Sequence, residues 1–321
     1  SQIKLAIIAI AIVIPLASFA VTQPSFNSEI SITENSKLQI ITSATFLNEF
    51  SQNIGKEMID VTLLVPMGAD PHDWEPTIRD TERLQEANMI IVNGIGYEHW
   101  LNSLEVTDIP GILVDTSNGI STLDSAKYDE EKHDDHAKED GHDDEDKHDE
   151  HNHGALDPHI WLNPVFAQLQ VKNIANALSN SDPTNKNYYQ SNAAIYNQEL
   201  DLLDSKIRTE LSGCKTDFIT FHDAFSYFSE EYGLTQHTII SSIDSHGEVT
   251  PKTLENIISL ARELNIKVIF AEESTSTKTS QVIADEIGGK VLVLSPLEIV
   301  SDETYVEKMT QNLQNLKDAL C

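Results

Sequence analysis

Three histidines of this chain stand where metal-binding or catalytic side chains are commonly found. His72 follows the β-branched run 61–65, His222 ends a run that begins at Phe218, and His159 precedes a helical segment. In open α/β sheets, ligands bind beyond the carboxyl ends of the strands, which is where His72 and His222 fall. A lone histidine is more often structural, but three histidines at the ends of predicted elements favour a metal site with imidazole ligands.

The elements that must position these histidines form two similar sets. In each set strands alternate with helices, a pattern typical of a parallel sheet built from βα units. The predicted strands are 38–41, 61–65, 89–92 and 112–114, and then 218–220, 238–241, 268–270 and 291–294. The predicted helices are 46–54, 78–87, 251–264 and 279–287. We therefore expect an α/β fold with two lobes, residues 37–181 and 213–321, whose sheets are flanked by helices.

A long helix is predicted between the lobes, over residues 182–212. This segment has no glycine and no proline after Pro183, and apolar residues recur every three or four positions from Tyr189 to Leu211. Asp182 is a suitable helix cap, and Pro183 a suitable first residue. About 28 residues at 1.5 Å each span about 40 Å, so the helix should be a stiff spacer that lets the lobes move only slightly.

Residues 1–20 have the features of a secretory signal peptide. Lys4 precedes an apolar run that begins at Leu5, and the small residues Ser18 and Ala20 suit a cleavage site. The run is nearly long enough to be an uncleaved membrane anchor, which stays open as the alternative. In either case the mature domain, which follows a polar tether at 21–36, is expected to be extracytoplasmic.

Residues 128–153 form a low-complexity segment of histidines and acidic residues. It holds half of the twelve histidines of the chain: His133, His136, His142, His148, His151 and His153. Because it shows no apolar periodicity, the segment is expected to be disordered. It is either a solvated acidic loop with incidental histidines or a loop that attracts metal ions weakly, and the density of histidines favours the second.

The charge and the cysteines restrict the partners further. A formal net charge of -31 argues against nucleic acid as a partner and fits a cationic ligand or simple solubility. The only cysteines, Cys214 and Cys321, form no C-x-x-C pair, so no thiolate metal site is expected. In an exported chain two cysteines more often form one disulfide than stay free, so we expect these two to be bonded.

Several longer motifs resemble a known family. They are VPMGADPHDWEPT at 65–77, DPHIWLNP at 157–164, TFHDAFSYFSEEYGL at 220–234, GEVTPKTLENII at 247–258 and LVLSPLE at 292–298. From about residue 38 to its end, the chain is similar to the zinc- and manganese-type solute-binding proteins of ABC importers, the ZnuA-like or TroA-like group. The resemblance implies two α/β lobes joined by one long helix. It also implies a metal ion between the lobes, bound by His72 and His159 of the first and His222 of the second.

The resemblance leaves the fourth ligand open. Relatives often have an aspartate where this chain has Ser295, which is a poor ligand, but some zinc-binding relatives use a glutamate that matches Glu298. We expect Glu298, with water or a histidine of segment 128–153 as the alternatives. Three imidazoles and one carboxylate suit tetrahedral Zn2+, whereas Mn2+ prefers more oxygen ligands. Manganese-type relatives usually have a carboxylate at the position of His222, so Mn2+ is the less favoured cargo.

The function that the resemblance implies is capture of zinc by a monomeric receptor and its delivery to the permease of an ABC transporter. An adhesin or metal-storage protein of the same fold and a secreted zinc hydrolase are the alternatives. The hydrolase is the least favoured, because neither H-E-x-x-H nor G-x-S-x-G occurs in the sequence. We therefore expect neither an enzyme activity nor a catalytic residue.

Overall fold

The computed structural model describes residues 37–66, 69, 71–104, 109–123, 156–240, 249–273 and 277–321. The predicted signal or anchor segment, the tether and the histidine-rich segment 128–153 lie outside these residues.

The first sheet is parallel, with the strand order β2-β1-β3-β4. Its strands are β1 (Leu38–Thr42), β2 (Ile59–Leu63), β3 (Met89–Val92) and β4 (Ile112–Asp115), and its helices α1 (Thr45–Gly55) and α2 (Ile78–Glu86) follow β1 and β2. All four residues of β3 are buried, as expected for a parallel strand that is covered on both faces.

The second sheet repeats this arrangement, with the parallel order β6-β5-β7-β8. Its strands are β5 (Asp217–Thr220), β6 (Thr235–Thr238), β7 (Val268–Ala271) and β8 (Lys290–Val293). The helices α5 (Ser226–Tyr232), α6 (Pro251–Glu263) and α7 (Lys278–Ile287) connect them. Thr250 caps α6 through a hydrogen bond from the Thr253 N–H, so Pro251 stands at the first turn as its sequence predicts.

Strand β6 differs from its prediction. The apolar run at 238–241 predicted the strand, but the strand is the polar segment Thr235–Thr238. Its register with β5 pairs Asp217 with Thr235 and Thr220 with Thr238. Ile239 and Ile240 are buried just beyond the strand end, so their apolar character reflects core packing rather than strand pairing.

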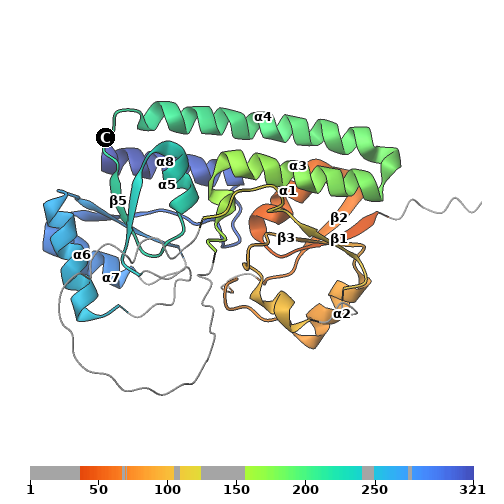
Figure 1. The fold of residues 1–321 in the computed structure, drawn as a ribbon, viewed down its shortest axis with the longest axis horizontal. Coiled ribbons are helices and arrows are strands. Elements are labelled where there is room, and N and C mark those ends of the chain that lie inside the picture. The colour runs from red at the N-terminus through yellow and green to blue at the C-terminus, as the bar shows by residue number, and fades with distance from the viewer. Residues whose placement is uncertain are drawn as a thin grey trace, which may run out of the picture. The chain divides into compact units, whose positions relative to one another are not determined.

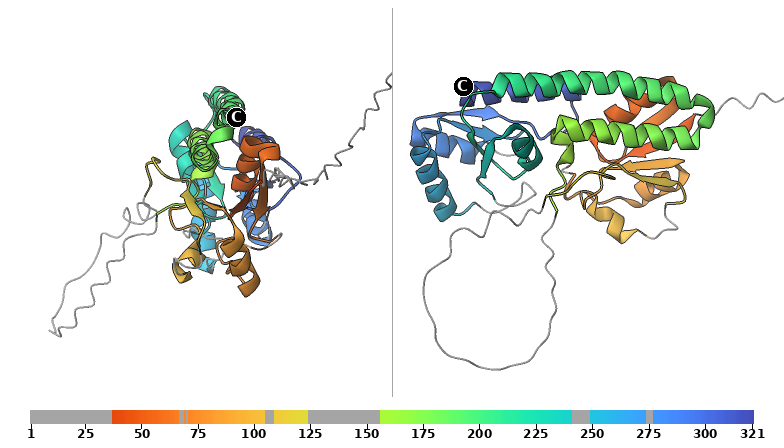
Figure 2. Two further views of the ribbon diagram at one scale, coloured as in Figure 1. Left: turned by 90° about the vertical axis from the view of Figure 1, so that its right-hand side faces the viewer. Right: turned by 45° about the horizontal axis from the view of Figure 1, so that its top comes forward.

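Three long helices cover the two sheets, and only the longest of them extends along both (Figure 1). They are α3 (Pro164–Ser181), α4 (Lys186–Leu211) and α8 (Tyr305–Leu320), and Figures 1 and 2 show α4 lying alongside α3. The long helix begins at Lys186 instead of Pro183, because Asp182 caps a separate 3-10 turn, Pro183–Asn185. Its 26 residues still span about 39 Å.

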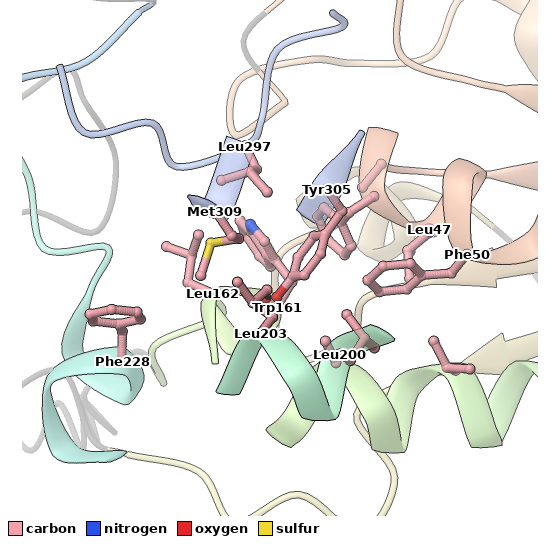
Figure 3. Packing of buried hydrophobic residues seen from close by; sticks show 14 of the residues in the cluster. Leu47, Phe50, Trp161, Leu162, Leu200, Leu203, Phe228, Leu297, Tyr305 and Met309 are labelled. Carbon is pink, nitrogen blue, oxygen red and sulfur yellow. Dashed lines mark hydrogen bonds between the residues drawn. The ribbon is translucent and has the colours of Figure 1, made fainter. Parts of the chain in front are cut away.

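The core is continuous between the two sheets. One buried apolar cluster includes side chains of α1, α3, α4 and α8 together with β5 and β7 residues. Figure 3 shows Trp161 at its centre, near Leu297, Met309 and Leu203. The Trp161 ring stacks on Phe46 with a centroid separation of 4.4 Å. This shared packing supports the expectation that the two halves move little relative to each other.

The disulfide Cys214–Cys321 is present, as expected. It joins the segment after α4 to the residue after α8, next to a backbone hydrogen bond from the Lys215 N–H to the Leu320 carbonyl. Within the described ranges, every helix is too short or too polar to cross a membrane.

Candidate metal centre

The structure brings the four expected ligand residues, His72, His159, His222 and Glu298, into one group. Their candidate ligand atoms all lie within 4.8 Å of one another. The three histidines expose 8%, 0% and 0% of their surface, in sequence order, so the group is shielded from solvent. Four donor groups from distant parts of the chain thus converge on one point.

Each member of the group reaches it from the end of an element. His72 follows β2, His222 follows β5, and Glu298 follows β8, whereas His159 lies directly before the 3-10 turn Ile160–Leu162 that leads into α3. Parallel strands end at the same edge of their sheet, so the first and second sheets each present such an edge to the group.

The distances suit a small tetrahedral ion. The Nε2 atoms of His159 and His222 are 3.4 Å apart, and Glu298 Oε1 lies 3.5 Å from His159 Nε2. Ligands at about 2.0 Å from a tetrahedral Zn2+ are about 3.3 Å from each other. His72 Nε2 lies closer to Glu298 Oε1, at 2.8 Å, in a direct hydrogen bond. The arrangement can hold a cation with small rearrangements of side chains.

The electrostatics of the group favour a cation. Burial disfavours the charged imidazole of His159, but hydrogen bonds with Asp157 and Glu298 outweigh burial and raise the pKa of His159 to about 10. Burial also disfavours the Glu298 carboxylate, yet His72 and His159 hold the pKa of Glu298 well below its ordinary value. Without metal, the site therefore holds a proton at neutral pH that an incoming cation must replace.

Two hydrogen bonds attach the Glu298 segment to the first half of the chain. Trp161 Nε1–H donates to the Pro296 carbonyl at 2.8 Å, and Thr45 Oγ1–H donates to the Leu297 carbonyl at 2.9 Å. Leu297 has a φ of 62°, an uncommon backbone conformation for a residue with a side chain. These two hydrogen bonds hold the backbone directly before Glu298, and so place the Glu298 side chain next to the histidines.

Ser295 takes a structural role instead of a ligand's. Its hydroxyl donates to Glu273 Oε2 at 2.9 Å and accepts from the Leu297 N–H at 3.2 Å. Glu273 in turn forms an ion pair with Lys308. Ser295 thus helps to shape the turn that carries Glu298.

Sequence reasoning missed two carboxylates behind the histidines. Asp157 Oδ1 lies 2.8 Å from His159 Nδ1, and Glu272 Oε1 lies 2.6 Å from His222 Nδ1. Asp157 could have been found, since it stands two residues before His159 in DPHIWLNP. Glu272 directly follows the last residue of β7, where a carboxylate at a strand end was a usable signal. The six histidines of segment 128–153 lie outside the described residues, so their expected weak metal binding stays a prediction.

Comparison with known proteins identifies the family of this chain. The family model "Zinc-uptake complex component A periplasmic" (ZnuA) matches residues 40–319. The chain is 40% identical over 293 residues to the high-affinity zinc uptake system protein ZnuA of Bacillus subtilis, and the match covers 88% of each. It is 30% identical to the zinc-binding protein AdcA of Streptococcus pyogenes, of which it spans 56% of the length.

A solved structure shares the fold. A ZnuA variant that lacks residues 138–173 and has zinc bound superposes with a TM-score of 0.73 at 29% identity, covering 88% of this chain and 98% of that one. The fold of two parallel sheets flanked by helices is therefore one that solved ZnuA structures share. The chain belongs to the ZnuA family.

Proposed function

We propose that this chain is the extracytoplasmic receptor of an ABC importer, which binds one Zn2+ through His72, His159, His222 and Glu298 and delivers it to the permease. The convergence of three imidazoles and one carboxylate at a buried point carries the proposal. Borderline nitrogen ligands with a single carboxylate suit Zn2+ better than Mn2+, which prefers oxygen.

The closed geometry favours a binding protein over a hydrolase. A catalytic zinc keeps an open position for water or substrate, with three protein ligands, whereas four protein ligands close a tetrahedral site. Here four protein groups surround the point, and the histidines are almost fully buried. Such a site holds a cargo ion and keeps water away from it.

Zinc titration against a competing chelator tests the proposal. The wild-type chain should bind one zinc tightly, and His72→Ala and His222→Ala should each weaken binding more than about a hundredfold. This magnitude follows from a zinc binding free energy of about 10–16 kcal/mol shared among four ligands. Exposed His99 provides the control, because His99→Ala removes an imidazole outside the group.

The titration can also overturn the proposal. Unchanged affinity in both His72→Ala and His222→Ala would remove the tight site from this group. Tighter binding of Mn2+ than of Zn2+ by the wild-type chain would assign another cargo. Hydrolytic turnover by the zinc-loaded chain that His222→Ala abolishes would favour the enzyme alternative.

A further inference from the structure

Two buried carboxylates repeat one geometry behind two of the four group members. Asp157 Oδ1 lies 2.9 Å from the backbone nitrogen of His159 and 2.8 Å from its Nδ1. Glu272 Oε1 lies 3.1 Å from the backbone nitrogen of His222 and 2.6 Å from its Nδ1. In both pairs one oxygen faces the main chain and the ring of the same histidine.

This geometry determines the tautomer. An ionised carboxylate oxygen can only accept hydrogen bonds, so it accepts from the backbone N–H and the ring nitrogen that faces it must also donate. Nδ1 of both rings therefore carries hydrogen, and the lone pair of the neutral ring is left on Nε2. The Nε2 atoms of His159 and His222 are the ones that face each other across 3.4 Å. Both rings thus present their metal-binding nitrogen to the centre of the group.

Both carboxylates are buried, and the backbone that carries each of them is held in place. Asp157 is 2% exposed, its carbonyl accepts from the Tyr227 hydroxyl at 2.7 Å, and its N–H donates to the Leu123 carbonyl. Glu272 is 3% exposed and directly follows β7, which pairs with β5 and so brings Glu272 to His222. Rigid partners of this kind keep the rings from rotating away when no metal is bound.

We propose that Asp157 and Glu272 are positioning residues of the zinc site, which fix the tautomer and the orientation of His159 and His222. The inference rests on the proposed function, since it deepens the description of the same site. Neither residue contacts the ion itself. Each acts through the ring of its histidine, in a carboxylate–histidine–metal arrangement.

The charge of the two residues supports the same role. Asp157 Oδ2 and Glu272 Oε2 are buried and have no hydrogen-bond partner among the described residues. A Zn2+ ion bound with the Glu298 carboxylate alone leaves a buried net charge of about +1, and Asp157 and Glu272 place two negative charges close to it. A buried cation is more stable when anions lie near it.

Four variants test the proposal in the full chain by chelator-competition titration with zinc. Asp157→Ala and Glu272→Ala should each weaken zinc binding about 10- to 100-fold, the usual effect of losing such a partner. Asp157→Asn and Glu272→Gln should lose less. The backbone N–H fixes the amide oxygen at the same place, so it still accepts from Nδ1–H.

A matched control exists elsewhere in the second sheet. Asp217 Oδ1 lies 3.0 Å from His237 Nε2, in a carboxylate–histidine pair that includes none of the four group members. Asp217→Ala should leave zinc affinity unchanged. This control shows whether the loss of zinc affinity is specific to the Asp157–His159 and Glu272–His222 pairs or follows from breaking any carboxylate–histidine pair.

A second readout depends on the tautomer and not on stability. Nitrogen-15 NMR of the zinc-loaded wild-type chain should show His159 and His222 with hydrogen on Nδ1 and metal on Nε2. Both Nδ1–H signals should persist in the amide variants, and each should exchange rapidly in the corresponding alanine variant. This measurement decides the question even where an alanine variant folds poorly.

The outcomes separate this inference from the proposed function. A wild-type chain without tight zinc binding would overturn both. Tight binding by the wild type together with affinities within about twofold in the alanine variants would overturn the inference alone. Metal on Nδ1 of either ring, or amide variants as weak as the alanine variants, would overturn it equally.

Discussion

Zinc affinity should depend on pH well above the range in which histidine ordinarily titrates. His159 lies between the Asp157 and Glu298 carboxylates, which outweigh the effect of burial and raise its pKa to about 10 in the metal-free protein. Zinc can bind only to a neutral imidazole, so it must displace this proton. Glu298 does not compete, because its pKa is held well below the ordinary value and it stays ionised.

The size of the pH effect follows from the raised pKa of His159. At every pH below about 10 the metal-free His159 is mostly protonated, so observed affinity changes about tenfold per pH unit. Between pH 8.5 and 6.5 His159 alone should lower zinc affinity about a hundredfold. A histidine with the ordinary pKa of about 6.5 would lower it only about twofold over the same interval.

Competition with a chelator of known pH dependence, at pH 8.5, 7.5 and 6.5, measures this change. Calorimetry at pH 7.5 in two buffers of different ionisation enthalpy should also show at least about one proton released per zinc bound. Affinities that agree within about twofold from pH 8.5 to 6.5, with no proton released, would refute the assignment of His159 as a protonated ligand.

Four further predictions concern the structure around the site. Replacing both Cys214 and Cys321 by Ser opens a link across 107 residues and should lower the free energy of unfolding by up to about 4.8 kcal/mol, measured by urea denaturation under non-reducing conditions. Equal denaturation midpoints would contradict this. Trp161→Phe removes the hydrogen bond to the Pro296 carbonyl and should speed zinc dissociation about 2- to 10-fold in a stopped-flow chelator assay. An unchanged rate would show that this hydrogen bond does not hold the Glu298 segment in place. Deleting residues 129–152 should leave one tight zinc per chain in a titration and remove weaker ones, and loss of the tight site would mean that the segment supplies a primary ligand. Zinc should change the radius of gyration in small-angle scattering only slightly, and a large decrease would show that the long helix does not restrain the two halves.

Much of the fold could be predicted because its signals are local. The apolar stripe from Tyr189 to Leu211 predicts α4, and the β-branched run at Met89–Val92 predicts β3 with its observed bounds. The prediction of β6 was wrong, since the apolar residues Ile239 and Ile240 are buried after the strand instead of within it. Periodicity cannot separate strand pairing from core packing in so short a run.

The site was predictable to the extent that strand ends and motifs reveal it. His72 and His222 stand at strand ends and His159 precedes a helical segment, and the resemblance to a known family adds Glu298. What the sequence could not provide is pairing across the sheet. Glu272 lies 50 residues from His222, and only the β5–β7 pairing brings its carboxylate to the ring.

X-ray absorption spectroscopy at the zinc edge of the loaded chain tests the central claim most directly. The account predicts three imidazole nitrogens at about 2.0–2.1 Å and one carboxylate oxygen at about 2.0–2.2 Å, with one imidazole fewer in His222→Ala. A sulfur ligand, a shell dominated by oxygen, or an unchanged imidazole count in His222→Ala would contradict it.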